Sequence, residues 1–94
     1  MQEKFLPVGT VVLLKEGSKR LMITGYCLAS PANPKKIFDY AGCLFPEGFI
    51  RDNQVALFNH DDIQRVDHLG LIDDEQKEFC TKLKEAINAQ KQSN

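Results

Sequence analysis

Three short segments of this chain are apolar at almost every position, and they limit the folds that it can adopt. The segments are VVLL at residues 11–14, LMI at 21–23 and IFDYAGCLF at 37–45. Successive side chains of a strand point to opposite faces of a sheet, so a half-buried strand is apolar only at every second position. We therefore expect strands that are covered on both faces. The interior of a small barrel would cover one face, and a helix of the chain or a partner would cover the other.

Glycine, proline and charged residues divide the first 70 residues into short strands. The expected strands are residues 8–14, 21–28, 37–45, 55–58 and 64–70, separated by a hairpin loop at 15–19, a loop at 29–36 that contains Pro31 and Pro34, and a PEG turn at 46–48. Gly25 predicts a bulge inside the second strand. Asn59 can cap a single helical turn at 59–63, just before the last strand. This order of elements predicts a small five-stranded antiparallel SH3-like barrel or a curved sheet.

One amphipathic helix is expected after the strands. Phe79, Leu83 and Ile87 recur every four residues, with Cys80 and Ala86 beside them, which is typical of a helix with one apolar stripe. Asp73 or Asp74 can cap its N-terminus. A helix is wide enough to span about two strands, so we expect it to cover part of the outer face of the sheet.

The predicted fold class is therefore mainly β with a C-terminal α-helix (α+β). We expect one domain over residues 1–94, since a chain of this length cannot build two cores. The β barrel would occupy residues 6–70 and the helix 73–90, with a frayed tail at 91–94.

The charge balance gives little support to nucleic-acid or membrane partners. Twelve basic and thirteen acidic residues give a formal net charge of -1, so no basic surface is expected. No apolar run approaches the roughly 18 residues of a membrane span, and the N-terminus has no apolar signal region. We expect a cytoplasmic protein without membrane insertion. The odd number and wide spacing of Cys27, Cys43 and Cys80 predict reduced, buried thiols.

Residues that could carry catalysis or bind a metal form no recognisable pattern. His60, Asp61 and Asp62 lack the spacing of zinc ligands, and neither CxxC nor HExxH occurs. Cys43 lies in an apolar strand, where burial would leave its thiol inert. We predict no catalytic residue, no metal, no cofactor and no enzymatic activity.

Two kinds of surface remain as candidate binding sites. Sizeable apolar patches usually mark protein interfaces, with aromatic residues as anchors. Tyr40, Phe45 and Phe49 are the predicted partner-binding residues on this argument. Lys35 and Lys36, followed by Phe38 and Tyr40, resemble a basic and aromatic surface for single-stranded nucleic acid. That pattern keeps a small-barrel nucleic-acid-binding protein as an alternative, although the charge balance argues against nucleic acid.

Several segments together resemble a family of small domains of unknown function from Gram-positive bacteria. The segments are LPVGTVVLLK at 6–15, RLMITG at 20–25, DYAG at 39–42, PEG at 46–48 and FNHDDI at 58–63. The resemblance spans residues 6–70 and departs from the family pattern at Arg20, where lysine is usual.

The resemblance implies a function that composition and spacing do not. Members of that family are often encoded beside type VII secretion genes and LXG toxins. By resemblance, this chain would be a cytoplasmic accessory protein, a chaperone-like adaptor that binds a secretion effector or toxin before export. A toxin immunity protein is a related alternative. The oligomeric state stays open, including a homo-oligomer.

Overall fold

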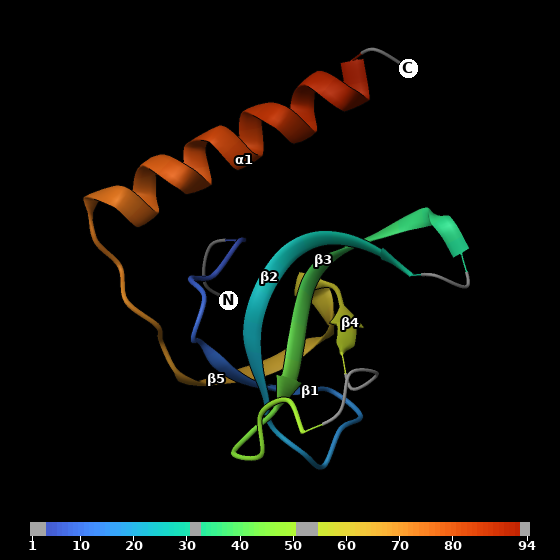
Figure 1. Cartoon of the computed structure of the whole chain (residues 1–94), viewed down its shortest axis with the longest axis vertical. Coiled ribbons are helices and arrows are strands. Elements are labelled where there is room, and N and C mark those ends of the chain that lie inside the picture. The colour runs from blue at the N-terminus through green and yellow to red at the C-terminus, as the bar shows by residue number, and fades with distance from the viewer. Residues whose placement is uncertain (1–3, 31–32, 51–54, 93–94) are drawn as a thin grey trace.

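The apolar segments form a curved antiparallel sheet, and a long helix lies across one end of it (Figure 1). The computed structural model describes residues 4–30, 33–50 and 55–92. Its elements are β1 (Val11–Leu14), β2 (Leu21–Ser30), β3 (Asn33–Leu44), β4 (Ala56–Phe58), the 3-10 helix η1 (His60–Asp62), β5 (Ile63–His68) and α1 (Asp74–Gln92). These elements confirm the predicted fold class, mainly β with one C-terminal helix.

The strand order is β4-β3-β2-β1-β5, with every pairing antiparallel. Within the described residues the sheet does not close into a barrel, so the curved sheet is the correct form of the prediction. β4 and β5 are its edges, and η1 joins them at one corner. The helical turn therefore occupies its predicted place before the last strand.

The main core lies on the inner face of the sheet. Its fully buried side chains include Val12, Ile23 and Phe58. The N-terminal segment and α1 pack against this same inner cluster through Phe5, Leu6, Cys80, Leu83 and Ile87. The prediction that the helix covers the outer face is therefore wrong, because the apolar stripe of α1 closes the inner side.

The outer face buries small side chains between larger neighbours. Ala41 and Cys43 of β3 are 2% and 1% exposed, although neither belongs to the inner cluster. Cys43 pairs with Met22, and Met22 pairs with Val11, so one row of apolar side chains crosses β3, β2 and β1. Small residues in such a row are covered by their cross-strand neighbours.

The strand bounds differ from the prediction most at the start of β1 and at the loop between β2 and β3. β1 starts at Val11 rather than at residue 8, because Gly9 has a φ of +94° and the Thr10 N–H donates to the Pro7 carbonyl at 3.2 Å, which makes a turn. β2 and β3 extend into the loop predicted at 29–36, up to Ser30 and from Asn33 onward. Pro34 lies within β3, where β4 does not pair with it, and proline is tolerated on such an unpaired edge. Pro31 lies outside the described residues.

Other local predictions are confirmed. The pairing of β2 with β3 shifts its register between Ile23 and Gly25, which is the predicted bulge. Asp73 caps α1, since its Oδ1 accepts a hydrogen bond from the Gln76 N–H at 2.9 Å. α1 runs to Gln92, two residues past its predicted end, because the sequence there consists of good helix formers. Residues 93–94 lie outside the described part of the chain.

Gly42 allows the backbone of β2 and the ring of Phe58 to lie close to β3, which gives a testable prediction. A Cβ atom at this position would lie 2.6 Å from the Met22 carbonyl oxygen and 3.2 Å from Cε1 of Phe58. The Met22 oxygen belongs to the backbone and cannot move aside without disturbing the β2–β3 ladder. Gly42→Ala is expected to lower the free energy of unfolding by about 1–3 kcal/mol, measured by urea denaturation.

Gly25→Ala is the matched control, because a Cβ there meets nothing within 4 Å. It should change the free energy of unfolding by less than about 0.5 kcal/mol. Equal effects of the two substitutions would contradict this account of Gly42.

Candidate functional site

The buried hydroxyl of Tyr40 ties the N-terminal segment to the sheet. Its oxygen accepts hydrogen bonds from the backbone N–H groups of Phe5 at 2.9 Å and Leu6 at 3.1 Å. The same oxygen lies 2.8 Å from Nδ1 of His60. A phenol has one proton to donate, and the two N–H groups use its acceptor sites, so that proton goes to Nδ1 of His60. This assignment makes Nδ1 of His60 the acceptor of the Tyr40 hydrogen bond.

The middle of β3 and the turn that follows β4 are held together by reciprocal hydrogen bonds. The Asp39 N–H donates to Oδ1 of Asn59 at 3.1 Å, and the His60 N–H donates to Oδ2 of Asp39 at 2.9 Å. The ring of Phe58 stacks on that of Tyr40 with centroids 5.4 Å apart. The DYAG and FNHDDI segments therefore meet in one corner of the sheet. Their hydrogen bonds and the ring contact hold β3 against the turn that follows β4.

The residues that could have formed a metal or acid–base site, His60, Asp61 and Asp62, lie in the same corner, where His60 and Asp62 make structural hydrogen bonds. Asp62 Oδ2 accepts from the Asn59 N–H at 2.9 Å and so closes the helical turn. His60 bonds to Tyr40, and Asp61 is exposed. Across the described residues, no three His, Cys, Asp or Glu side chains are grouped closely enough to hold a metal ion.

The three predicted partner-binding residues do not form one surface. Tyr40 is 0% exposed, so its place in a surface patch is corrected: its ring fills the inner core. Phe45 is half-buried on the outer face, with the Arg20 guanidinium 4.9 Å from its ring centroid. Phe49 is 53% exposed and remains available to a partner.

The structure also weakens the argument that Lys35, Lys36 and the aromatic residues after them form a surface for single-stranded nucleic acid. Lys35 and Lys36 are exposed, and Nζ of Lys36 lies 5.0 Å from the ring centroid of Phe38. Burial of Tyr40 removes one of the two aromatic rings on which a base could stack.

The three cysteines are free thiols, as expected, but only Cys43 is fully buried. Cys27 and Cys80 are half-buried. Cys27 has a φ of +54°, and burial, aided by the negative charge of Asp39, raises the pKa of its thiol. A raised pKa favours the unreactive thiol over the thiolate.

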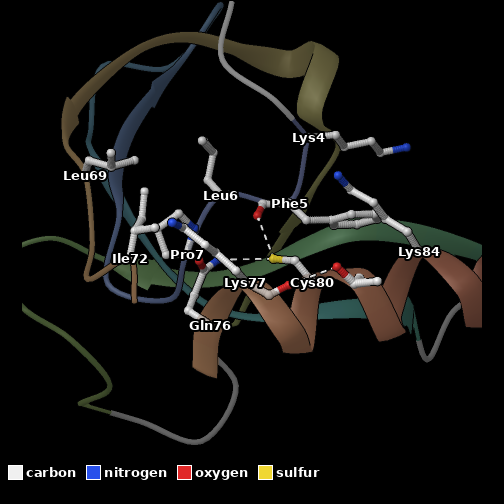
Figure 2. A pocket seen from close by; sticks show the side chains of 11 residues that line it. Lys4, Phe5, Leu6, Pro7, Leu69, Ile72, Gln76, Lys77, Cys80 and Lys84 are labelled. Atoms are coloured by element: carbon white, nitrogen blue, oxygen red, sulfur yellow. Dashed lines mark hydrogen bonds between the residues drawn. The ribbon is translucent and has the colours of Figure 1, made fainter. Parts of the chain in front are cut away.

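A groove runs between α1, the N-terminal segment and the linker that joins β5 to α1 (Figure 2). Its volume is about 330 Å³. The lining residues come from all three segments: Lys4, Phe5, Leu6 and Pro7; Leu69 and Ile72; Gln76, Lys77, Cys80, Thr81 and Lys84. Sequence reasoning missed this site. The sequence feature that could have indicated the groove is LGLI at 69–72, an apolar run between the last strand and the helix.

Polar contacts on the groove floor fix the helix to the N-terminal segment. The Cys80 thiol donates to the Phe5 carbonyl at 3.4 Å and accepts a hydrogen bond from Nε2 of Gln76 at 3.1 Å, as Figure 2 shows. The Tyr26 hydroxyl donates to the Leu6 carbonyl, and the Tyr26 ring lies 5.9 Å from that of Phe79. The groove therefore has a fixed shape on its helical side.

Exposed apolar side chains gather on the three segments that form the groove, and two of them, Leu69 and Ile72, line it. The side chains concerned come from the N-terminal segment, the linker and the first turns of α1: Val8 at 53% exposed, Leu69 at 37%, Leu71 at 75%, Ile72 at 45% and Phe79 at 50%. We call these five residues the apolar rim. The linker is held in place, because the Gly70 N–H donates to Oγ1 of Thr10 at 3.0 Å.

Together these features define a small α+β domain, a curved five-stranded sheet with one C-terminal helix and a groove between them. Residues 5–79 match the family described as "Domain of unknown function (DUF4176)", and the chain belongs to that family. No curated protein and no solved structure matches the chain significantly. In the described part of the chain, no helix has the length and apolar character to cross a membrane.

Tyr40→Phe tests the role of the buried hydroxyl. The substitution keeps the ring but leaves the N–H groups of Phe5 and Leu6 without their acceptor. Each buried donor without a partner costs about 1–3 kcal/mol, so we expect a loss of roughly 2–5 kcal/mol in the free energy of unfolding. Urea denaturation measures that loss, and amide exchange at Phe5 and Leu6 should become faster than in the wild type. Unchanged stability together with unchanged exchange would contradict this role.

The tyrosines also predict a loss of stability at alkaline pH. Burial, together with the nearby Cys80 and Tyr40, raises the pKa of Tyr26 from 10.0 to about 12, and burial raises the pKa of Tyr40 as well. A raised pKa means that the folded state favours the neutral phenol. The stabilisation is therefore complete below pH 10 and is lost as the pH rises toward about 12.

We expect the free energy of unfolding to fall between about pH 10 and about pH 12, measured by urea denaturation at each pH. Tyr26→Phe should show a smaller fall over the same interval. A Tyr26→Phe variant with the full wild-type fall would show that Tyr26 is not responsible.

Proposed function

We propose that this domain is a non-enzymatic accessory protein that binds another protein through the apolar rim and the groove that it surrounds. The observation that carries the proposal is the exposure of Leu69, Leu71 and Ile72 on one short linker. Such a concentration of exposed apolar side chains usually marks an interaction site.

The rigidity of the linker supports the proposal. A Cβ atom at Gly70 would lie only 2.4 Å from the Val8 carbonyl oxygen, so the linker backbone packs directly against the N-terminal segment. The side chains on either side of Gly70 are therefore presented in a fixed arrangement. A fixed surface loses less conformational entropy on binding than a loose loop does.

The proposed partner is a toxin or effector of a type VII secretion system. This part of the proposal depends on the resemblance, which implies a chaperone-like adaptor encoded beside such genes. The adaptor would act in the cytoplasm and shield apolar surface of the toxin before export. Binding of this kind requires no catalytic group.

Co-expression with an LXG toxin, the proposed class of partner, tests the proposal. We expect the two proteins to co-purify as a complex of defined stoichiometry, measured by size-exclusion chromatography with light scattering. Leu71→Ser combined with Ile72→Ser should weaken the complex at least about tenfold in titration calorimetry, because each buried aliphatic side chain contributes about 1 kcal/mol or more.

Ile37→Ser is the matched control, since Ile37 is 57% exposed but lies on the β2–β3 hairpin. This variant should bind the toxin as the wild type does. The proposal fails if no complex forms, or if the variant with both linker substitutions binds as tightly as the control.

A further inference from the structure

We propose that the groove binds an acidic, amphipathic α-helix of the partner protein. This inference rests on the proposed function in one respect, that the domain binds a protein. It goes further by assigning the shape and charge of the bound segment.

The charge of the groove is one-sided. Three of its 11 lining residues are the lysines Lys4, Lys77 and Lys84, and none of them is acidic. A groove that carries only positive charge favours a negatively charged ligand and disfavours a positive one.

Glu78 and Glu85 of α1 lie away from the face of the helix that lines the groove. At 100° per residue, positions 76, 77, 80, 81 and 84 share the face that lines the groove. Glu78, Lys82 and Glu85 fall on the other face, where Lys82 pairs with Glu78 at 3.5 Å. The charge of the whole chain is therefore nearly balanced while the groove itself is positive.

The lysines stand at two ends of an apolar floor. In Figure 2, Lys77 lies beside Pro7 and Ile72, whereas Lys4 and Lys84 lie at the other end beside Phe5. Lys4 already pairs with Asp39 at 3.1 Å, but its side chain is 48% exposed, so a second carboxylate can reach it. Leu69 and Ile72, which are 37% and 45% exposed, supply the accessible apolar surface of the groove.

The spacing of the lysines fits a helical ligand. Lys77 and Lys84 are seven residues apart, which is about 10 Å along the axis of α1. Two carboxylates on a partner helix at positions i and i+7 have the same separation, and apolar residues at i+3 and i+4 would face the floor between them. A second hollow of about 260 Å³, lined by Lys4, Phe5, Lys84, Ile87 and Asn88, extends the groove along α1.

Two other occupants fit less well. A second copy of the chain could offer Glu78 and Glu85 of its own α1, which are also seven residues apart, but Thr81 and Lys82 between them are polar. A single-stranded nucleic acid would need aromatic side chains for stacking. Phe5 is the aromatic residue that lines the groove, and it is only 5% exposed.

Selection from a random peptide library displayed on phage tests the inference. The peptides should have about 15 residues, or roughly four helical turns. We expect enrichment of peptides with Asp or Glu at i and i+7 and apolar residues at i+3 and i+4. A selected peptide, measured by fluorescence anisotropy, should bind Lys77→Gln/Lys84→Gln at least about fivefold more weakly than the wild type.

Lys15→Gln/Lys82→Gln is the matched control. It removes the same charge from exposed lysines outside the groove, so the selected peptide should bind it as it binds the wild type. The inference is overturned if no such peptides are enriched, or if both double variants bind the peptide equally. Displacement of the peptide by a mixed-sequence single-stranded oligonucleotide would also overturn it, in favour of nucleic acid.

The two proposals fail separately. If the toxin co-purifies but the library yields no acidic helical peptides, this inference fails and the proposed function stands. If the toxin does not bind, the proposed function fails whatever the library yields.

Discussion

The hydrogen bonds of the Tyr40 hydroxyl are the contacts on which the rest of the structure depends. They join the inner face of the sheet to the backbone of Phe5 and Leu6, more than thirty residues earlier in the chain. The N-terminal segment then lies between the sheet and α1 (Figure 1). The helix reaches the sheet through this segment and through the contact of Phe79 with Tyr26. A buried polar group with all its hydrogen bonds made can fix such an arrangement uniquely, because no alternative packing satisfies it.

The groove is a consequence of this three-layer arrangement. A helix packed directly on strands would bury its whole apolar stripe, whereas α1 rests on an irregular segment and leaves Phe79 half exposed. Most of the stability of a helix in a protein comes from packing of its apolar face, so α1 is expected to be among the less stable elements. A partner helix in the groove would supply the missing apolar contacts. The exposed rim and the incomplete burial of α1 therefore have one physical origin.

Much of the fold could be predicted from the sequence, because its elements are set by local patterns. Apolar runs and turn residues located the strands, and the spacing of Phe79, Leu83 and Ile87 located α1. The sequence could not show which side chains of each strand face the core, since that depends on contacts between distant segments. The apolar pattern of β3 does not show that Tyr40 points inward to bond with the N-terminus, so a core residue was predicted on the surface. The groove was missed for the same reason, because it exists only where α1 docks. Phe49 alone kept its predicted exposure.

Amide hydrogen exchange of the chain, free and in complex with an LXG toxin as the proposed partner, tests the central claim most directly. That claim is that the surface formed by the N-terminal segment, the linker and α1 is where a partner binds. The account predicts slower exchange on binding at Phe5 and Leu6, at residues 69–72 and in the first three turns of α1, with little change on the β2–β3 hairpin. Protection confined to the hairpin or to the outer face of the sheet, with none around the groove, would contradict it.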